Sequence, residues 1–200
     1  VTAGQDPEAP LLYRLVEAFV EHHGRVVRKR LILDRGFLDG AQIGRCKQEW
    51  GIDVLLPARQ NMEIVQDVLG LAEAGELSFR PWVAPVSSSK PIPLHRPEWI
   101  QKREEARQRT LARKKAQASN PNPPDPSKVR VRSEVAAVSR VETFSSCPIP
   151  LDVLVNRETY ADGHTDYWVL LDTASIREPA HTREEYGLRT TIEERHLQLK

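Results

Sequence analysis

Four polar side chains are spaced so that they share one face of a predicted helix near the end of this 200-residue chain. At 100° per residue, all four fall within an arc of about 60°. They are Tyr186, Arg189, Glu193 and Lys200. Three apolar residues fall on the opposite side, where they can pack against a sheet: Leu188, Ile192 and Leu199. The pattern predicts that a carboxylate, two cations and a phenol face one cleft. The alternative is a charged face turned to water, as on any amphipathic helix.

A second carboxylate stands at the end of a predicted buried strand. Leu31, Ile32 and Leu33 form a continuous apolar run, which is typical of a strand covered on both faces. Asp34 follows directly, and Arg35-Gly36 break the strand.

The spacing of the helix residues resembles the Y-x2-R-x3-E-x6-K signature of a large group of bacterial insertion-sequence transposases of the DDE type. The segment YGLRTTIEERHLQLK is similar to that motif at all four positions. Upstream, LILDRGF (31–37) resembles the strand by which the family delivers its second catalytic aspartate, with Asp34 at its end. The opening VTAGQDPEAPLL resembles the segment just before that strand. The resemblance covers the segments 1–75 and 165–200 and is weak between them.

The resemblance implies an RNase H-like fold in which two aspartates and one glutamate hold two divalent ions, Mg²⁺ or Mn²⁺. Asp34 and Glu193 are the implied catalytic residues and metal ligands, and Tyr186, Arg189 and Lys200 are implied to contact DNA phosphates. Mg²⁺ prefers hard oxygen ligands. Two such ions about 4 Å apart contact both the attacking and the leaving oxygen of a phosphoryl transfer. The carboxylates of Asp34 and Glu193 are therefore expected within about 4–8 Å of each other.

Three features depart from the family pattern. The family's first aspartate lies on an earlier strand that this chain does not include, and Asp6 matches the loop that follows that strand. Thr190 stands where many relatives have tryptophan, and Glu194 lies only 100° around the helix from Glu193. We expect the chain, which opens at Val1, to be a fragment that binds metal poorly and cuts no DNA by itself.

The elements that must position these residues alternate between helix and strand at the start of the chain. Three helices and two strands are predicted: 9–23, 38–50 and 61–74, then 26–33 and 52–57. Asn61 is the expected N-cap of the third helix, and Gly40 and Gly44 weaken the second. The alternation predicts an α/β architecture with neighbouring strands joined by a helical crossover.

The middle of the chain is predicted to be an insertion into that core. The expected divisions are a first core part at 1–76, an insertion at 77–178 and the core helix that carries the catalytic glutamate at 179–200. Within the insertion, residues 85–128 are basic, Pro-rich and expected to be flexible, and 129–173 are β-rich. Strand candidates lie on either side of a turn: 151–156 and 167–173, around 161–163. The last helix is predicted to begin after Pro179, with Thr182 as N-cap and Glu185 completing a capping box.

Positive charge is concentrated between Ser87 and Arg132. This stretch holds 12 Lys or Arg and 4 Asp or Glu, a net charge of +8, whereas the whole chain has +1. A basic run lies inside it: Lys102, Arg103, Arg107, Arg109, Arg113, Lys114 and Lys115. Such a run favours contact with a polyanion, which gives affinity without sequence choice. A merely solvated helix is the alternative.

Composition excludes several classes of protein. Two distant cysteines, Cys46 and Cys147, suggest neither a disulfide framework nor a zinc site. No apolar run approaches the 18 or so residues of a membrane span. We therefore expect a cytoplasmic protein without a membrane partner, and the resemblance implies that it is nucleoid-associated. The resemblance implies binding to double-stranded DNA, at transposon ends and target, as a homodimer.

Two other functions remain open from the sequence. The chain could be a truncated transposase remnant that binds DNA without cutting it, or an unrelated α/β domain whose basic segment binds RNA. The last of these predicts that Asp34 and Glu193 lie far apart. Minor candidates have structural interpretations beside functional ones: His22-His23 as a helix end, Asp53 as a strand start, Tyr167-Trp168 as core or DNA-stacking residues, and Asp172 as a turn or cap residue.

Overall fold

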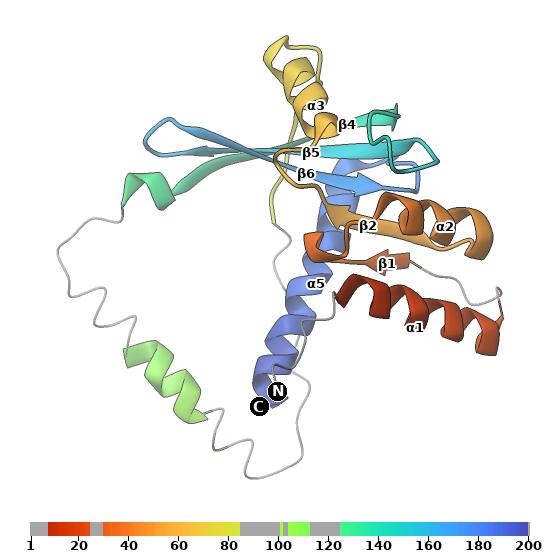
Figure 1. Cartoon of the computed structure of the whole chain (residues 1–200). Helices are drawn as coiled ribbons and strands as arrows, with labels where there is room; N and C mark the ends of the chain where they lie inside the picture. The colour runs from red at the N-terminus through yellow and green to blue at the C-terminus, as the bar shows by residue number, and fades with distance from the viewer. Residues whose placement is uncertain (1–7, 25–29, 85–100, 102–103, 113–124, 200) are drawn as a thin grey trace, which may run out of the picture.

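One mixed sheet of six strands organises the chain (Figure 1). The computed structural model describes residues 8–24, 30–84, 101, 104–112 and 125–199, with the backbone alone at 8–9 and 190–199. The strands, in chain order, are β1 (Arg30–Ile32), β2 (Asp53–Pro57), β3 (Arg80–Pro81), β4 (Arg130–Val141), β5 (Leu151–Tyr160) and β6 (Thr165–Asp172). Their order across the sheet is β1-β2-β6-β5-β4-β3. The pair β1–β2 is parallel and every other pair is antiparallel.

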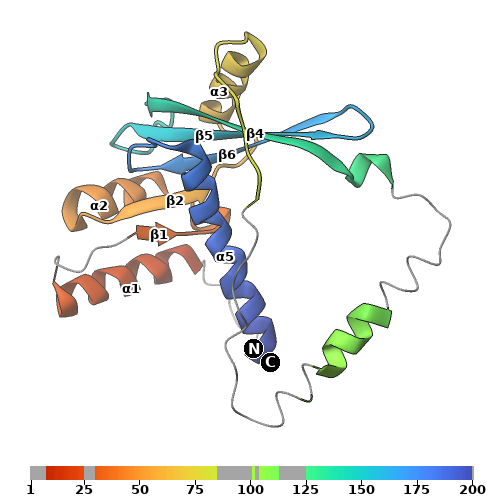
Figure 2. The same ribbon diagram turned by 180° about the vertical axis from the view of Figure 1, so that it is seen from behind.

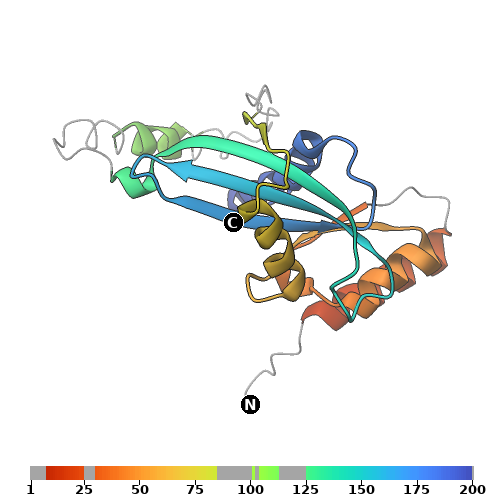
Figure 3. The same cartoon turned by 90° about the horizontal axis from the view of Figure 1, so that it is seen from above.

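Helices lie on both faces of this sheet (Figures 2 and 3). One face is covered by α1 (Glu8–His23), α2 (Gly40–Trp50) and α3 (Glu63–Glu73), and the other by α5 (Pro179–Leu199). A further helical stretch spans residues 104–112. Short 3-10 turns follow β1 and precede β4, at Arg35–Phe37 and Pro126–Lys128. The architecture is therefore mixed α/β in three layers, as the alternation of helix and strand predicted.

Alternation along the central strands explains the two layers of core. Val54 and Leu56 of β2 pack with α1, α2 and α3, whereas Leu55 between them packs in the second cluster with Tyr186 of α5. β6 follows the same rule, with Val169 and Leu171 on the first face and Leu170 on the second. Successive side chains of a strand point to opposite faces, so continuous apolar runs are required where both faces are covered.

The residues predicted as a β-rich insertion belong to this same sheet. β4, β5 and β6 form an antiparallel meander, and β6 pairs with β2 through Leu55–Asp172, Leu56–Leu171 and Pro57–Leu170. The predicted turn at 161–163 joins β5 to β6, and Gly163 adopts a φ of 91° that favours glycine. Of the basic segment 85–128, only residues 101, 104–112 and 125–128 are among those described.

Three local predictions were wrong. α3 has Met62 rather than Asn61 at its N-cap, without a side-chain capping bond. α5 begins at Pro179, so Thr182 lies inside the helix, buried against the sheet, and its N–H donates to the carbonyl of Glu178. Leu188 is 58% exposed instead of packed, because α5 turns its Thr182, Arg183 and Tyr186 side to the sheet.

Gly40 and Gly44 are required by packing. A Cβ on Gly40 would lie 2.6 Å from the backbone carbon of Ser146, and one on Gly44 would lie 2.4 Å from Pro148. The connection between β4 and β5 therefore rests directly on α2. By contrast, a Cβ on Gly70 of α3 would meet nothing within 4 Å.

These environments predict opposite effects for the same substitution. Gly40→Ala should destabilise the fold by about 1–3 kcal/mol, because backbone atoms must move to admit the methyl group. Gly70→Ala should stabilise it by about 0.5–1 kcal/mol through helix propensity. Urea unfolding followed by circular dichroism measures both. Equal changes in the two variants would contradict the close approach of Ser146 to α2.

Candidate active-site pocket

A pocket of about 330 Å³ opens where the carboxyl ends of β1 and β2 meet α5 and β6. The following residues line it: Asp34, Arg35, Pro57, Ala58, Gln60, Trp168, Val169, Tyr186 and Arg189. Because β1 and β2 are neighbouring parallel strands, their carboxyl ends lie at the same edge of the sheet. Ligands of α/β proteins commonly bind beyond such ends.

Asp34 is held in place by the strand before it and the turn after it. Parallel pairing continues to Leu33, whose N–H donates to the carbonyl of Leu55. Asp34 then caps the 3-10 turn, since its Oδ1 accepts a hydrogen bond of 2.7 Å from the Arg35 N–H. The side chain remains 51% exposed, so the carboxylate faces the pocket.

α5 brings Arg189 and Tyr186 to this carboxylate. Arg189 Nη1 lies 2.9 Å from Asp34 Oδ1 and 3.5 Å from the Tyr186 hydroxyl, to which it donates. The Tyr186 ring in turn lies 6.1 Å from the ring of Trp168 on β6. Three residues predicted for the site, Asp34, Tyr186 and Arg189, therefore line one pocket although the whole meander separates them in sequence.

Glu193 and Lys200 fall outside what can be compared. The backbone of α5 continues one turn beyond Arg189 to Glu193, but the Glu193 side chain and all of Lys200 lie outside the described residues. The expected separation of about 4–8 Å between the Asp34 and Glu193 carboxylates stays a prediction. Among the side chains that the structure describes, no three His, Cys, Asp or Glu residues are grouped so that they could hold a metal ion.

The chemistry of Asp34 suits a hard cation in one respect. Both contacts described for its carboxylate, from Arg35 N–H and Arg189, fall on Oδ1. The second oxygen of such a carboxylate can serve as one ligand of Mg²⁺ or Mn²⁺, and the ion takes its remaining ligands from other carboxylates, phosphate or water.

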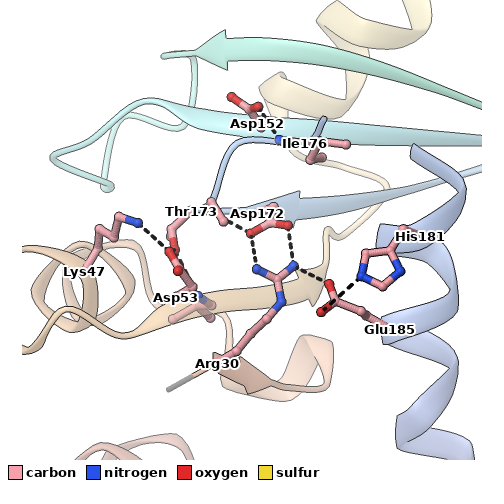
Figure 4. Close-up of polar contacts among 11 residues, drawn as sticks. Arg30, Lys47, Asp53, Asp152, Asp172, Thr173, Ile176, His181 and Glu185 are labelled. Atoms are coloured by element: carbon pink, nitrogen blue, oxygen red, sulfur yellow. Dashed lines mark hydrogen bonds and ion pairs between the residues drawn. The ribbon is translucent and has the colours of Figure 1, made fainter. Parts of the chain in front are cut away.

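Away from the pocket, an ion-pair cluster connects α5 to the amino end of β1 and the carboxyl end of β6 (Figure 4). Arg30 makes two hydrogen bonds, of 2.6 and 3.2 Å, to the buried carboxylate of Asp172. Its Nη2 also lies 3.1 Å from Glu185, and Glu185 lies 3.9 Å from His181. Glu185 therefore pairs across elements instead of completing a capping box. Burial raises the pKa of Asp172 from its ordinary value, although the hydrogen bonds and charge of Arg30 oppose the rise.

Asp172 and Asp53 have structural roles. Asp172 accepts the N–H of Ala174, as a turn residue would, but its main partner is Arg30. Asp53 lies at the amino end of β2, away from the pocket, and bonds Lys47 and Thr173. No sequence pattern indicates the Arg30–Asp172 pair, because its two members are distant in the chain and each resembles a surface charge.

The basic run shows only two of its seven residues. Arg107 and Arg109 lie exposed on the helical stretch 104–112, and Arg107 Nη1 is 3.8 Å from Glu104. The others lie outside the described residues: Lys102, Arg103, Arg113, Lys114 and Lys115. Exposed guanidinium groups suit phosphate contact and a solvated surface equally.

The remaining minor candidates divide between surface and pocket. His22 and His23 are exposed at the end of α1, with rings 4.7 Å apart at nearly right angles. Trp168 lines the pocket, whereas Tyr167 packs against the first core cluster and lies 6.4 Å from Phe79. No helix in the described part of the chain is long and apolar enough to cross a membrane.

Comparison of the chain with protein-family models, with curated proteins and with solved structures found no match. Its function is therefore inferred from its own residues and their arrangement.

The Arg30 cluster yields a pH-dependent prediction. Arg30→Met should destabilise the fold at pH 7 by about 3 kcal/mol, because it leaves the Asp172 carboxylate buried without a cation. This penalty is fully present above the raised pKa of Asp172 in the folded chain. It disappears as the pH falls toward the ordinary aspartate pKa, since protonation removes the buried charge.

The control for this variant is Lys47→Met, which breaks the partly exposed pair with Asp53. We expect it to cost less than about 1 kcal/mol. Urea titrations from about pH 4, near the ordinary aspartate pKa, up to neutral pH measure both variants. A loss for Arg30→Met that is independent of pH would contradict the role of Asp172.

Proposed function

We propose that this chain is part of a DDE-type DNA transposase with an RNase H-like core, in which Asp34 and Glu193 are two of three catalytic carboxylates. One observation carries the proposal: Asp34, Tyr186 and Arg189, picked out by two separate sequence motifs, line the same pocket. Nothing local in the sequence requires a strand end and a helix more than a hundred residues later to meet. Their meeting therefore supports a shared site.

The proposed roles follow from the chemistry of each group. Asp34 and Glu193 would hold Mg²⁺ or Mn²⁺, and two such ions, when bound, supply activation of the attacking oxygen and stabilisation of the leaving one. Arg189 can make bidentate contacts to a DNA phosphate, Lys200 adds a point charge, and the Tyr186 hydroxyl can donate a hydrogen bond. Trp168, on the pocket wall, offers an aromatic face to the same DNA.

Arg189 has a second role within this proposal. Its guanidinium lies 2.9 Å from Asp34 Oδ1, where it neutralises the carboxylate. A DNA phosphate that binds Arg189 would break its ion pair with Asp34. The Asp34 carboxylate could then bind a metal cation. Binding of DNA and binding of metal would therefore favour each other at this site.

The third carboxylate would come from a strand beside β1. β1 is the edge strand of the sheet, and its outer side carries no partner strand among the described residues. Asp34 and Glu193 alone, as two of the three proposed ligands, should bind metal weakly and leave DNA uncut. In cells the proposal implies double-stranded DNA as partner, with transposon ends and target held by a homodimer at the nucleoid.

Two alternatives remain. A transposase remnant that binds DNA without cleaving it would keep the same pocket and the net charge of +8 between Ser87 and Arg132. An unrelated RNA-binding α/β domain would not need Asp34 near α5. The pairing of Asp34 with Arg189, one helical turn before Glu193, favours the transposase proposal over the RNA-binding one.

Metal-directed cleavage of the protein tests whether Asp34 and Glu193 share an ion. Fe²⁺ bound in place of Mg²⁺, with ascorbate and peroxide, releases hydroxyl radicals that cut the backbone near the ion. Fe²⁺ is used at millimolar concentration to offset weak binding. The chain should then be cut at two places, around 31–37 and around 189–195. Peptide mapping by mass spectrometry locates the cuts.

Asp34→Asn should abolish both cuts together, because one ligand is lost to a shared ion. Asp67→Asn, an exposed acid on α3 outside the pocket, is the matched control and should abolish neither. Cuts at one segment alone, or cuts that Asp34→Asn leaves unchanged, would show that the two carboxylates bind no common ion.

DNA affinity tests the role assigned to Arg189. Arg189→Gln should weaken binding to a DNA duplex by about tenfold and reduce the slope of log affinity against log salt by about one. Arg14→Gln removes the same charge from an exposed position on α1 and should change neither. Fluorescence anisotropy over a series of salt concentrations measures both variants. Equal losses in the two would mean that DNA responds to net charge alone and that the pocket is not its site.

A further inference from the structure

Arg183 is a cation buried in the layer between α5 and the sheet. Its side chain is 5% exposed, and its two terminal nitrogens donate to the strand β5, at 3.0 Å to Asn156 Oδ1 and 2.5 Å to Glu158 Oε1. Glu158 is paired a second time, with Arg130 at 2.8 Å. Burial alone would raise the pKa of Glu158, but the hydrogen bond from Arg183 and the charges of Arg130 and Arg183 outweigh it and lower the pKa. Both members of the buried pair are therefore ionised.

The same guanidinium lies over two aromatic rings. Its central carbon lies 3.8 Å from the ring centre of Trp82, which follows β3, and 5.0 Å from that of Trp168 on β6. Asn156, which receives one hydrogen bond from Arg183, donates another to the carbonyl of Trp168 at 3.2 Å. Arg183 thus fixes Trp168 through its ring and, by way of Asn156, through its backbone.

The position of Trp168 matters to the pocket. Trp168 forms part of the pocket wall, and its ring lies 6.1 Å from that of Tyr186. Tyr186 and Arg189 follow Arg183 on the same helix at intervals of three residues, so the point at which Arg183 docks sets where both reach the pocket.

The buried pair is better suited to fixing a geometry than to adding stability. Replacing a buried ion pair by apolar residues of similar size is often neutral or stabilising, whereas a planar guanidinium that bonds two acceptors and lies over two rings defines one geometry. Lysine at the same place could still neutralise Glu158, but it could neither present a planar group to the tryptophans nor bond both acceptors in one plane.

We propose that Arg183 is a positioning residue. It fixes Trp168 in the pocket wall, and it sets the position along the sheet at which α5 presents Tyr186 and Arg189 to the pocket. The inference rests on the proposed function only in taking DNA as the ligand of the pocket. The geometric part of it stands on contacts among described residues.

Two readouts separate positioning from general stability. In protein labelled with 5-fluorotryptophan, ¹⁹F NMR gives one resonance for each of the 4 tryptophans, and Trp168→Phe identifies that of Trp168. Fluorescence anisotropy with a DNA duplex measures binding at the pocket. It is done at a salt concentration where Arg189→Gln binds more weakly than the wild type. Arg183→Lys should shift and broaden the Trp168 resonance and weaken binding about tenfold, the effect of one misplaced charged hydrogen bond. Its unfolding midpoint should stay within a few degrees of wild type.

The matched control is Arg157→Lys, which alters a guanidinium that likewise pairs with an acid, Glu134, and lies over an aromatic ring, that of Phe79. It should leave the resonance and the affinity unchanged. If Arg183→Lys leaves the Trp168 resonance in place, Arg183 positions nothing in the pocket and the inference is wrong. If the resonance shifts but Arg189→Gln never weakens DNA binding in the wild-type background, the positioning role holds and DNA as the ligand, with the proposed function, fails.

Discussion

The antiparallel pairing of β2 with β6 is the constraint on which the rest of the structure depends. It is the seam between the first part of the chain and the meander of β4, β5 and β6. Hydrogen bonds extend the seam beyond both ends of the ladder. The Ala58 N–H donates to the Val169 carbonyl, and Val54 exchanges bonds with Thr173, whose N–H and hydroxyl both take part. With this register set, Trp168 stands beside the carboxyl ends of β1 and β2, and α5 must cross the sheet next to Asp34.

The attachment of α5 is mostly polar, which is unusual for a helix that covers a sheet. Arg183 bonds Asn156 and Glu158, Glu185 pairs with Arg30, and Arg189 pairs with Asp34. Among the α5 side chains that the structure describes, which end at Arg189, Tyr186 packs against the second apolar cluster. Directional bonds at three successive places fix the rotation of the helix more tightly than an apolar stripe could, since dispersion contacts tolerate sliding. A helix that must present particular side chains to a pocket benefits from that precision.

Much of the layout could be predicted from sequence because the signals were local. The runs around Leu31 and Leu55 predicted strands, and helical spacing predicted α1, α2 and the approximate extent of α5. The order of strands could not be predicted, because β2 chooses β6 through contacts between distant segments. Thr182 was mistaken for a cap and Leu188 for a core residue because an amphipathic pattern assumes that a helix buries its apolar side. Here the buried side carries Arg183, whose charge is neutralised by Glu158 and whose second acceptor is Asn156, both on the distant strand β5. Asp34, Tyr186 and Arg189 were found through motif spacing, whereas Arg30 and Arg183 had no signal in the sequence to distinguish them from surface charges.

The seam also has a consequence for how the chain comes to fold during its synthesis. β2 leaves the ribosome long before β6, and until β6 arrives one side of β2 presents unsatisfied backbone groups next to Leu55 and Leu56, which later become fully buried. Sheets closed by such distant pairing have high contact order and form slowly. The pocket can therefore be completed only after β6 and α5 have been synthesised, since both contribute to its wall. Until then the unpaired side of β2 is open to pairing with other strands, which is the kind of exposure that promotes association between nascent chains.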